Sequence, residues 1–470
     1  DYAQALISAE VDNTLATIAR TTKLDLTMPQ VTSFVDGDKV SAAPLLEYHR
    51  MKVGHKPDIV CPVEYSLRNY QFYPHEFQPE AKTLMKAFMS PLLNECFVPD
   101  STIGNEEQAI TERVEKVRAP VLDMTPFLNR VIDEFLQCLI PKAHQMDPTD
   151  DEEVDRRQNR PTQRRITENA QFESSVDVAS VFLKKESYGK VTDPRLITPV
   201  NGSDKVEYSK YQYPFSELLK TQEWYAFGKT PLDIANRVVA VLAYAATAAN
   251  SDFSRFDGHG SNLMRELERR ALTRAFRPQY HDKLLTLHRS QYGLNCVTTG
   301  GLWYSTEYAR ASGSPETSNF NSLVNAFVAF LAIRMTKFQG LFYTPEQAWA
   351  GLGIYGGDDG LTANIDPKTY QKAAAMIGQK LTVDTVQRGE FGIKFLARVY
   401  GPNVWFGDAN SCCDLPRQMS KLHVTVALSP KVTPIMKLIE KCRSLHLSDA
   451  MTPILGPLAT LVMELAGETV

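Results

Sequence analysis

The stretch YGGDDG, at residues 355–360, places two neighbouring carboxylates between glycines. Mostly apolar residues stand at 352–355 before the pair and at 361–363 after it. This pattern predicts a β-hairpin with Asp358 and Asp359 at its tip. Adjacent carboxylates repel each other unless a positive partner joins them, and a hard divalent cation is the usual partner because it prefers oxygen ligands. The pair therefore indicates a metal site that needs further ligands from elsewhere in the chain.

The composition is that of an ordinary soluble protein. The chain has 470 residues, of which 43% are hydrophobic and 23% charged, and its length suggests about three domains. With a formal net charge of −4, an enzyme that acts on nucleic acid must gather its basic residues locally. The seven cysteines contain no C-x-x-C pair, so we expect reduced thiols in an intracellular protein and no zinc site.

No segment predicts a membrane span or a signal peptide. The longest apolar run, residues 238–249, is too short to cross a bilayer. The first residue is Asp1 rather than Met, so we expect a fragment or processed piece of a longer protein, with any membrane anchor in the missing part. Helices are predicted at residues 12–20 and 80–89, and residues 1–115 are expected to brace the later domains.

A charge switch follows a predicted helical segment at residues 120–146. An acidic run at 147–155 is followed at once by five arginines within residues 156–165. Such a switch is typical of an exposed, solvated loop. The functional alternative is a loop that attracts a polyanion, for which Arg164 and Arg165 are the candidates.

A second basic stretch follows a short apolar strand at residues 181–183. Lys184, Lys185, Lys190 and Arg195 lie within twelve positions, around a Gly turn. Basic residues spaced along a hairpin suit a triphosphate, because several charge-assisted hydrogen bonds must converge on one group. An ordinary surface hairpin is the competing interpretation.

Two more carboxylates, Asp252 and Asp257, follow a predicted buried helix at residues 231–244. Asp252 ends an apolar stretch, and Asp257 lies five residues further on. The spacing D-x-x-x-x-D occurs by chance in most chains of this length, so it is not specific by itself.

The segment from Ser312 to Asn321, SGSPETSNFN, opens a long apolar helix. A glycine before a helix lets the backbone approach a ligand closely. Thr317 and Asn321 are four residues apart and therefore lie on one helical face. Small polar groups at a helix start can orient a sugar or a phosphate, and ordinary capping by Ser314 is the alternative.

These features occur in the order of the F, A, B and C motifs of viral RNA-dependent RNA polymerases, which the chain resembles. The string S-G-x-x-x-T-x-x-x-N at residues 312–321 is the most discriminating, and G-D-D lies downstream of it. Within that class, the strings DFSRFDG, YGGDDG and CDLPRQMSKLH resemble the polymerase domain of a nodavirus replicase. The resemblance is strong over residues 178–400, fair over 401–425 and weak elsewhere.

The resemblance implies an α+β fold shaped like a right hand, with an antiparallel palm sheet and mostly helical fingers and thumb. It also implies a division of the chain into an N-terminal extension packing on fingers and thumb (1–115), fingers (116–247), palm (248–262), a fingers insertion (263–300), palm (301–408) and thumb (409–470).

The resemblance further implies a role for each candidate residue. Asp252, Asp358 and Asp359 would bind two Mg²⁺ or Mn²⁺ ions for nucleotidyl transfer, with Asp358 the bridging ligand and Asp359 more peripheral. Arg398 lies in a hairpin that resembles the primer grip, and it would contact RNA, as would Arg164 and Arg165. The ribose 2′-hydroxyl would be recognised by Asp257, Ser312, Thr317 and Asn321. The triphosphate would be bound by Lys184, Lys190 and Arg195.

The implied activity is template-directed RNA synthesis in the replication and transcription of a viral genome. Its substrates are ribonucleoside triphosphates, and its partners are RNA template and product, the rest of a larger replicase chain and other replicase copies. Related nodavirus replicases work in the host cytoplasm, on membrane-bound complexes at the mitochondrial outer membrane, and the resemblance implies the same localisation.

Several assignments stay open at this point. Lys380 and Arg388 compete as the general acid for pyrophosphate, while Trp405 and Phe406 form either a stacking platform for a first nucleotide or ordinary packing. Two other functions also compete. A nucleotide cyclase has a G-G-[DE]-[DE] hairpin like residues 356–359, but lacks the S-G-x-x-x-T-x-x-x-N helix. A catalytically silent RNA-binding scaffold is opposed by the intact carboxylates.

Overall fold

The structure is a computed structural model that describes residues 67–73, 82–170, 178–426, 428 and 430–467. The helix predicted at residues 12–20 lies outside the described residues. Within them, no helix is long and apolar enough to cross a membrane.

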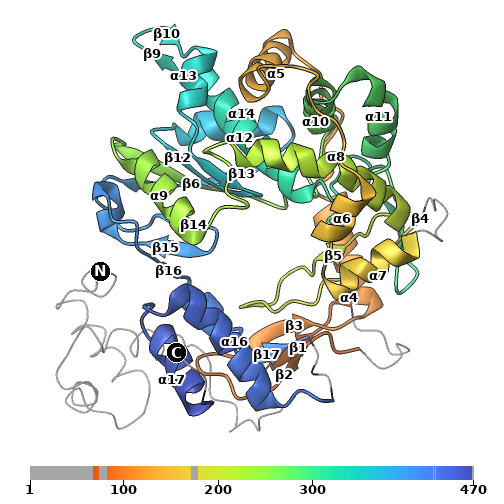
Figure 1. The fold of residues 1–470 in the computed structure, drawn as a ribbon, viewed down its shortest axis with the longest axis vertical. Helices are drawn as coiled ribbons and strands as arrows, with labels where there is room; N and C mark the ends of the chain where they lie inside the picture. The colour runs from red at the N-terminus through yellow and green to blue at the C-terminus, as the bar shows by residue number, and fades with distance from the viewer. Residues whose placement is uncertain (1–66, 74–81, 171–177, 427, 429, 468–470) are drawn as a thin grey trace.

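A four-stranded antiparallel sheet forms the centre of the upper part of the molecule (Figure 1). Its strands, in spatial order, are β11 (Ile354–Gly356), β12 (Asp359–Ala363), β6 (Thr247–Phe253) and β13 (Leu381–Gln387). Strands β11 and β12 form the hairpin predicted around the Asp pair. The predicted α+β class with an antiparallel central sheet is therefore confirmed.

The two faces of this sheet bury different side chains, as the two-residue repeat of a strand requires. Ala249 of β6 joins the larger hydrophobic cluster, which includes residues of α12 (Thr317–Arg334) and α14 (Pro367–Met376). Its neighbour Ala248 joins a smaller cluster on the other face, with residues of α9 (Pro231–Leu242). Because both faces are covered, functional groups on this sheet must lie at the strand ends.

Helix α12 is buried along almost its whole length, as an apolar circumference predicts. Phe327 and Phe330 pack edge-on against Phe135 of α5 (Pro126–Leu139), each with ring centroids 5.4 Å apart. The few polar residues on such a helix must find hydrogen-bond partners inside the protein, and several find them at the central sheet.

A second four-stranded sheet joins segments far apart in the sequence. Strand β4 (Val178–Leu183) pairs in parallel with β7 (Asn295–Thr298), and β5 (Leu196–Ile197) and β8 (Trp303–Ser305) flank them. This pairing fixes the start of the basic hairpin, which begins after β4. The helices on this side of the molecule (Figure 1) are α4 (Ile103–Ile110), α6 (Asp151–Arg157), α7 (Pro161–Ala170), α8 (Gly202–Lys220), α10 (Asn262–Ala275) and α11 (His281–Arg289).

The C-terminal helices α16 (Pro434–Asp449) and α17 (Leu455–Leu465) pack together at the lower end of Figure 1. Strand β17 (Val424–Thr425) pairs with β2 (Lys86–Ala87) just beside them. Other short elements are β1 (Leu67–Tyr70), β3 (Cys96–Pro99), β9 (Lys337–Phe338), β10 (Leu341–Phe342), α13 (Pro345–Ala350), β14 (Lys394–Phe395), β15 (Arg398–Tyr400), β16 (Ser411–Cys413) and α15 (Leu415–Met419).

The helix predicted at residues 80–89 is wrong over its described part, because residues 86–87 form a strand. Leu84 and Met85 are buried in one hydrophobic cluster with Val424. Pairing with β17 satisfies the backbone that a helix would have satisfied internally. Tertiary contacts therefore override a weak local helix propensity here.

The N-terminal part of the described chain contacts two distant regions. Phe97 and Tyr188 exchange backbone hydrogen bonds of 2.9 and 2.8 Å, which link β3 to the basic hairpin. The β2–β17 pair links the same part of the chain to the C-terminal segment. An extension packed on fingers and thumb requires contacts of this kind, but the boundaries of all the predicted domains stay a prediction.

An ion pair between half-buried Arg398 and buried Asp449 joins β15 to α16. The Arg398 guanidinium lies 3.2 and 3.3 Å from the two carboxylate oxygens of Asp449. Burial acts to raise the pKa of Asp449, but hydrogen bonds from Thr452, Ser448 and Arg398 outweigh it and hold the pKa at about 2. Because this value lies below the usual 3.8, the ionised pair stabilises the fold above about pH 4, and that contribution is lost as the pH falls towards 2.

We expect Asp449→Asn to lower the free energy of unfolding by about 2 kcal/mol at pH 7, because the half-buried Arg398 charge then loses its counter-charge. The difference from wild type should shrink as the pH falls from about 4 to about 2. Denaturant titrations of the purified protein across this pH range measure both effects.

Glu440→Gln on the same helix is the matched control. Glu440 is largely exposed in its pair with Lys437, so its loss should cost less than about 0.5 kcal/mol. If Asp449→Asn destabilises the protein no more than this control at pH 7, the ion pair does not carry the stability assigned to it.

Candidate active site

The register of the central sheet brings the predicted carboxylates together. Asp359 on β12 lies directly opposite Asp252 on β6, and Asp358 lies in the two-residue turn that joins β11 to β12. Gly357, the other turn residue, has a φ of +64°, which glycine adopts without strain and which two-residue hairpin turns require. Three carboxylates from two distant chain segments therefore share one end of the sheet.

These carboxylates raise one another's pKa. Burial, followed by the charges of Asp358 and Asp252, raises the pKa of Asp359 to about 6. Burial and the charge of Asp358 also raise the pKa of Asp252. Within the described residues, no group donates a hydrogen bond to the carboxylate of Asp252 or Asp359. Asp252 and Asp358 are exposed, so these oxygen donors fit a hard divalent cation arriving from solvent.

Helix α12 holds the turn that carries the Asp pair. Asn325 Nδ2 donates to the carbonyl oxygens of Gly357 and Asp359, both at 3.0 Å. The Ser322 hydroxyl oxygen accepts a hydrogen bond of 2.9 Å from the Gly357 N–H. Neither residue belongs to a sequence motif identified above, although polar residues three apart on an apolar helix are a signal that one face meets a polar partner.

A second polar pair lies beside the carboxylates. Asn321 Nδ2 donates to Asp257 Oδ1 at 2.9 Å. Burial raises the pKa of Asp257, whereas the hydrogen bond from Asn321 and the charge of Arg310 oppose that effect. The charges of Asp358 and Arg195 also act on Asp257, so this pair lies within electrostatic reach of the hairpin tip.

Ser312 and Thr317, predicted beside this pair, use their hydroxyls on the backbone. Thr317 Oγ1 donates to the carbonyl oxygens of Ala311 and Ser314, at 3.2 and 2.9 Å. Ser312 Oγ accepts from the Thr198 N–H at 3.1 Å. Both residues therefore brace the loop before α12, and only their remaining lone pairs are open to a ligand.

Comparison with known proteins gives relatives of one kind, although no protein-family model matches the chain. The RNA-directed RNA polymerase of striped jack nervous necrosis virus is 30% identical over 375 residues, which are 78% of this chain and 37% of that protein. The polymerase of greasy grouper nervous necrosis virus is 30% identical over 419 residues, 86% and 41% of the two chains. That of Flock house virus is 25% identical over 404 residues, 82% and 39% of the two chains. The chain is therefore a homologue of nodavirus RNA-directed RNA polymerases over most of its length.

The predicted resemblance to nodavirus polymerases is confirmed, and the four-stranded antiparallel sheet agrees with the predicted palm sheet. The chain spans about two fifths of the length of the relatives it matches, 37% and 41% for the two fish viruses. Among solved structures, the insertion-loop deletion mutant of the RNA-dependent RNA polymerase of a human picobirnavirus matches with a TM-score of 0.49 and 14% identity, over 76% of this chain and 79% of that chain.

Of the basic residues predicted to bind triphosphate, Arg195 has the clearest relation to the carboxylates. Its charge acts to lower the pKa of both Asp252 and Asp257. Lys184 Nζ lies 2.9 Å from Glu186 Oε2, and Arg195 Nε lies 3.5 Å from the other oxygen of Glu186. Glu186 therefore holds the two cations side by side.

The remaining predicted basic residues differ in what they contact. Arg164, Arg165 and Lys190 are exposed, and no ion pair engages their side chains in the part of the chain that the structure describes. Arg398 is bound to Asp449 and to Ser411, whose hydroxyl oxygen accepts from Arg398 Nε at 2.7 Å. These bonds give Arg398 a structural role, and its contact with RNA stays a prediction.

Two cations inside the string CDLPRQMSKLH, Arg417 and Lys421, were not predicted as site residues. The charge of Arg417 acts to lower the pKa of Asp359. Burial and the charge of Arg417 lower the pKa of Lys421, and the charges of Lys184 and Arg195 add to that effect. The C-terminal segment thus adds positive charge to the same side of the site as the basic hairpin.

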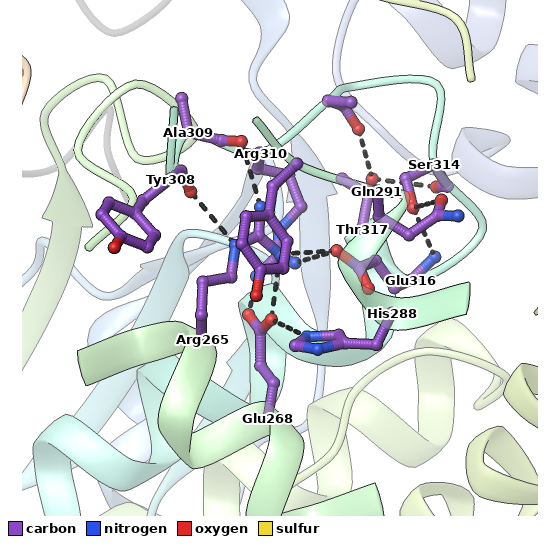
Figure 2. A network of polar contacts seen from close by, with 12 residues as sticks. Arg265, Glu268, His288, Gln291, Tyr308, Ala309, Arg310, Ser314, Glu316 and Thr317 are labelled. Carbon is purple, nitrogen blue, oxygen red and sulfur yellow. Dashed lines mark hydrogen bonds and ion pairs between the residues drawn. The ribbon is translucent and has the colours of Figure 1, made fainter. Parts of the chain in front are cut away.

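One group of potential metal ligands is not a cation site. Ligand atoms of Glu268, His288 and Glu316 lie within 4.8 Å of one another. Arg265 and Arg310 each bond to both carboxylates, as Figure 2 shows. Two guanidinium groups already balance the two carboxylates, so the group offers a further cation no uncompensated negative charge.

The geometry also bears on the open alternatives. Arg388 donates to carbonyl oxygens at the end of α9 and to that of Trp405, so its guanidinium caps a helix. Lys380 is exposed, and nothing in the described chain bonds to its ammonium group. Trp405 is only 1% exposed and donates to the Glu390 carbonyl oxygen at 3.0 Å, so it is core packing, whereas Phe406 is 69% exposed.

We expect Ser322→Ala to speed hydrogen exchange of the Gly357 amide by about fivefold, because the amide loses its acceptor and one hydrogen bond contributes about 1 kcal/mol. Mass spectrometry of a peptide covering residues 354–361 measures the rate. Ser318→Ala, one turn earlier on the exposed side of α12, is the matched control and should leave the rate unchanged. Equal exchange in the two variants would contradict the clamp.

Proposed function

We propose that this protein is the template-directed RNA polymerase of a nodavirus, which joins ribonucleoside triphosphates by two-metal nucleotidyl transfer in genome replication and transcription. One observation carries the proposal: the strand register sets Asp252 opposite Asp359, with Asp358 in the adjoining turn. The relatives named RNA-directed RNA polymerase support the class of reaction.

The carboxylate set suits two Mg²⁺ or Mn²⁺ ions. Asp252, Asp358 and Asp359 offer oxygen ligands from two chain segments, and Mg²⁺ takes its other ligands from phosphate and water. When bound, the ions supply Lewis-acid stabilisation of the phosphoryl group and lower the pKa of the attacking hydroxyl. The chain supplies position, because Ser322 and Asn325 bond to the backbone of Gly357 and Asp359 on either side of Asp358.

Other groups suit the remaining parts of an incoming ribonucleotide. Arg195 and Lys184 provide positive charge for the triphosphate. Asp257 and Asn321 offer a polar pair for the ribose 2′-hydroxyl, and a deoxyribonucleotide would leave that pair without its partner. Further residues that we assign to nucleotide or RNA contacts are Lys190, Ser312, Thr317, Arg164, Arg165 and Arg398.

The chain spans about two fifths of its relatives, so we include the rest of a longer replicase chain and other replicase copies among its partners, together with RNA template and product. We place the protein in the host cytoplasm, on membrane-bound replication complexes at the mitochondrial outer membrane. Flotation of the full-length protein with mitochondrial membranes tests that placement.

We expect Asp358→Asn to lower incorporation of labelled UTP by about 10³-fold, because losing a metal ligand removes several kcal/mol of transition-state stabilisation. The assay follows extension of a self-priming RNA hairpin with Mg²⁺ or Mn²⁺. Asp384→Asn is the matched control on the neighbouring strand β13, where Asp384 is exposed, and it should retain activity.

Near wild-type incorporation by Asp358→Asn would refute the site assignment. Formation of cyclic dinucleotides from GTP without template would instead identify a nucleotide cyclase. Metal-independent RNA binding without incorporation on any template would identify a silent scaffold.

We assign protonation of the departing pyrophosphate to Lys380, because the Arg388 guanidinium is engaged by carbonyl oxygens. Lys380→Leu should lower kcat for single-nucleotide incorporation by about 100-fold with little change in KM. Arg388→Lys should instead lower the melting temperature and leave kcat of the folded protein within about threefold. The opposite pattern in rapid-quench and thermal-denaturation measurements would exchange the two roles.

A further inference from the structure

A buried ionic network lies beneath the loop that precedes α12. It consists of Arg265 and Glu268 on α10, His288 on α11, and Arg310 and Glu316 in the loop, and Figure 2 draws all five. Each of the five residues is at least 95% buried. Two arginines and two glutamates balance in charge, so the network can persist in the interior.

Within the described chain, Arg310 links this network to Asn321, which we assign to the ribose. Its Nη1 lies 2.6 Å from Glu316 Oε1, and its Nη2 bonds to Glu268. Its third nitrogen, Nε, lies 2.8 Å from Asn321 Oδ1. Because the two carboxylates fix the plane of the guanidinium, the direction of its Nε–H is fixed as well.

The contacts of Asn321 fix the orientation of its amide. Arg310 Nε is a donor only, so it must meet the amide oxygen. The Asp257 carboxylate is an acceptor, so it must meet the amide nitrogen, at 2.9 Å. Without the arginine the amide is free to turn over and present its oxygen to the carboxylate, which would break the pair.

We propose that Arg310 is a positioning residue for ribonucleotide selection: it fixes the Asn321 amide so that Asn321 holds one Asp257 oxygen and leaves the other for the ribose hydroxyl. The inference rests on the proposed polymerase function. The backbone N–H of Arg310 also donates to the backbone carbonyl oxygen of Asp257 at 2.8 Å. Arg310 therefore contacts Asp257 through its backbone and Asn321 through its side chain.

Arg265 provides a control from within the same network. Its Nη1 lies 2.9 Å from Glu268 and 2.7 Å from Glu316, so it shares both carboxylates with Arg310. Its other donors bond to the carbonyl oxygens of Tyr308 and Ala309, and none reaches Asn321. Damage to the network alone should therefore be similar in Arg265→Lys and Arg310→Lys.

The experiment compares kcat/KM for UTP and for dUTP on a self-priming RNA hairpin, in the full-length wild type, Arg310→Lys and Arg265→Lys, with melting temperatures measured in parallel. We expect Arg310→Lys to lower the UTP/dUTP ratio by at least about tenfold, because the ribose site loses its fixed hydrogen-bonding pair. Arg265→Lys should change that ratio by less than about twofold, even though both variants melt at a lower temperature.

An unchanged ratio in Arg310→Lys, or an equal fall in both variants, would overturn the inference. If Arg310→Lys does not fold, Asn321→Asp decides, since it keeps the acceptor for Arg310 but cannot donate to Asp257; retained discrimination in that variant would likewise overturn it. Failure of the proposed function is a separate result, because then the wild type itself incorporates no UTP.

Discussion

Strands β6 and β12 meet in one antiparallel register, and the candidate active site depends on it. The register sets Asp252 opposite Asp359, although the two residues come from segments about a hundred residues apart. If either strand slipped by one residue, the side chains of that strand, including its carboxylate, would point to the opposite face of the sheet. The burial of Ala249 and Ala248 in separate cores prevents such a slip. The packing of small apolar side chains therefore determines where the three carboxylates lie.

Helix α12 connects this sheet to the rest of the molecule through its few polar residues. Asn325 bonds to the hairpin turn, and one turn earlier Asn321 bonds to Asp257 and Arg310. The two residues are four positions apart, so their side chains lie on the same face of the helix. The ionic network behind them extends to α8, where Tyr208 donates to Glu316 at 2.8 Å. The buried helix α12 thus connects the charged network, through hydrogen bonds of its polar side chains, to the carboxylates of the site.

Much of the fold was predictable where local pattern and final environment agree. The hairpin at residues 354–363 and the apolar helix after residue 317 form as their sequences predict, because turn chemistry and apolar periodicity are local properties. The helix predicted at residues 80–89 fails because its partner, strand β17, lies more than 300 residues further along the chain. Lys441 illustrates the same limit: it donates to three carbonyl oxygens around β17, which no local pattern indicates.

The sequence by itself determined the class of protein and the chemical types of the site: carboxylates at a hairpin tip, and hydroxyls and an amide at a helix entrance. The order of the motifs can be read from the chain without knowing which residues are in contact. Only the tertiary structure decided which of these groups are free and which are engaged. It engages Arg398 with Asp449 and Arg388 with a helix end, and it brings Arg310 to Asn321. The physical reason is that a donor or charge takes its role from the partners within a few ångströms of it, and folding supplies those partners from distant parts of the sequence.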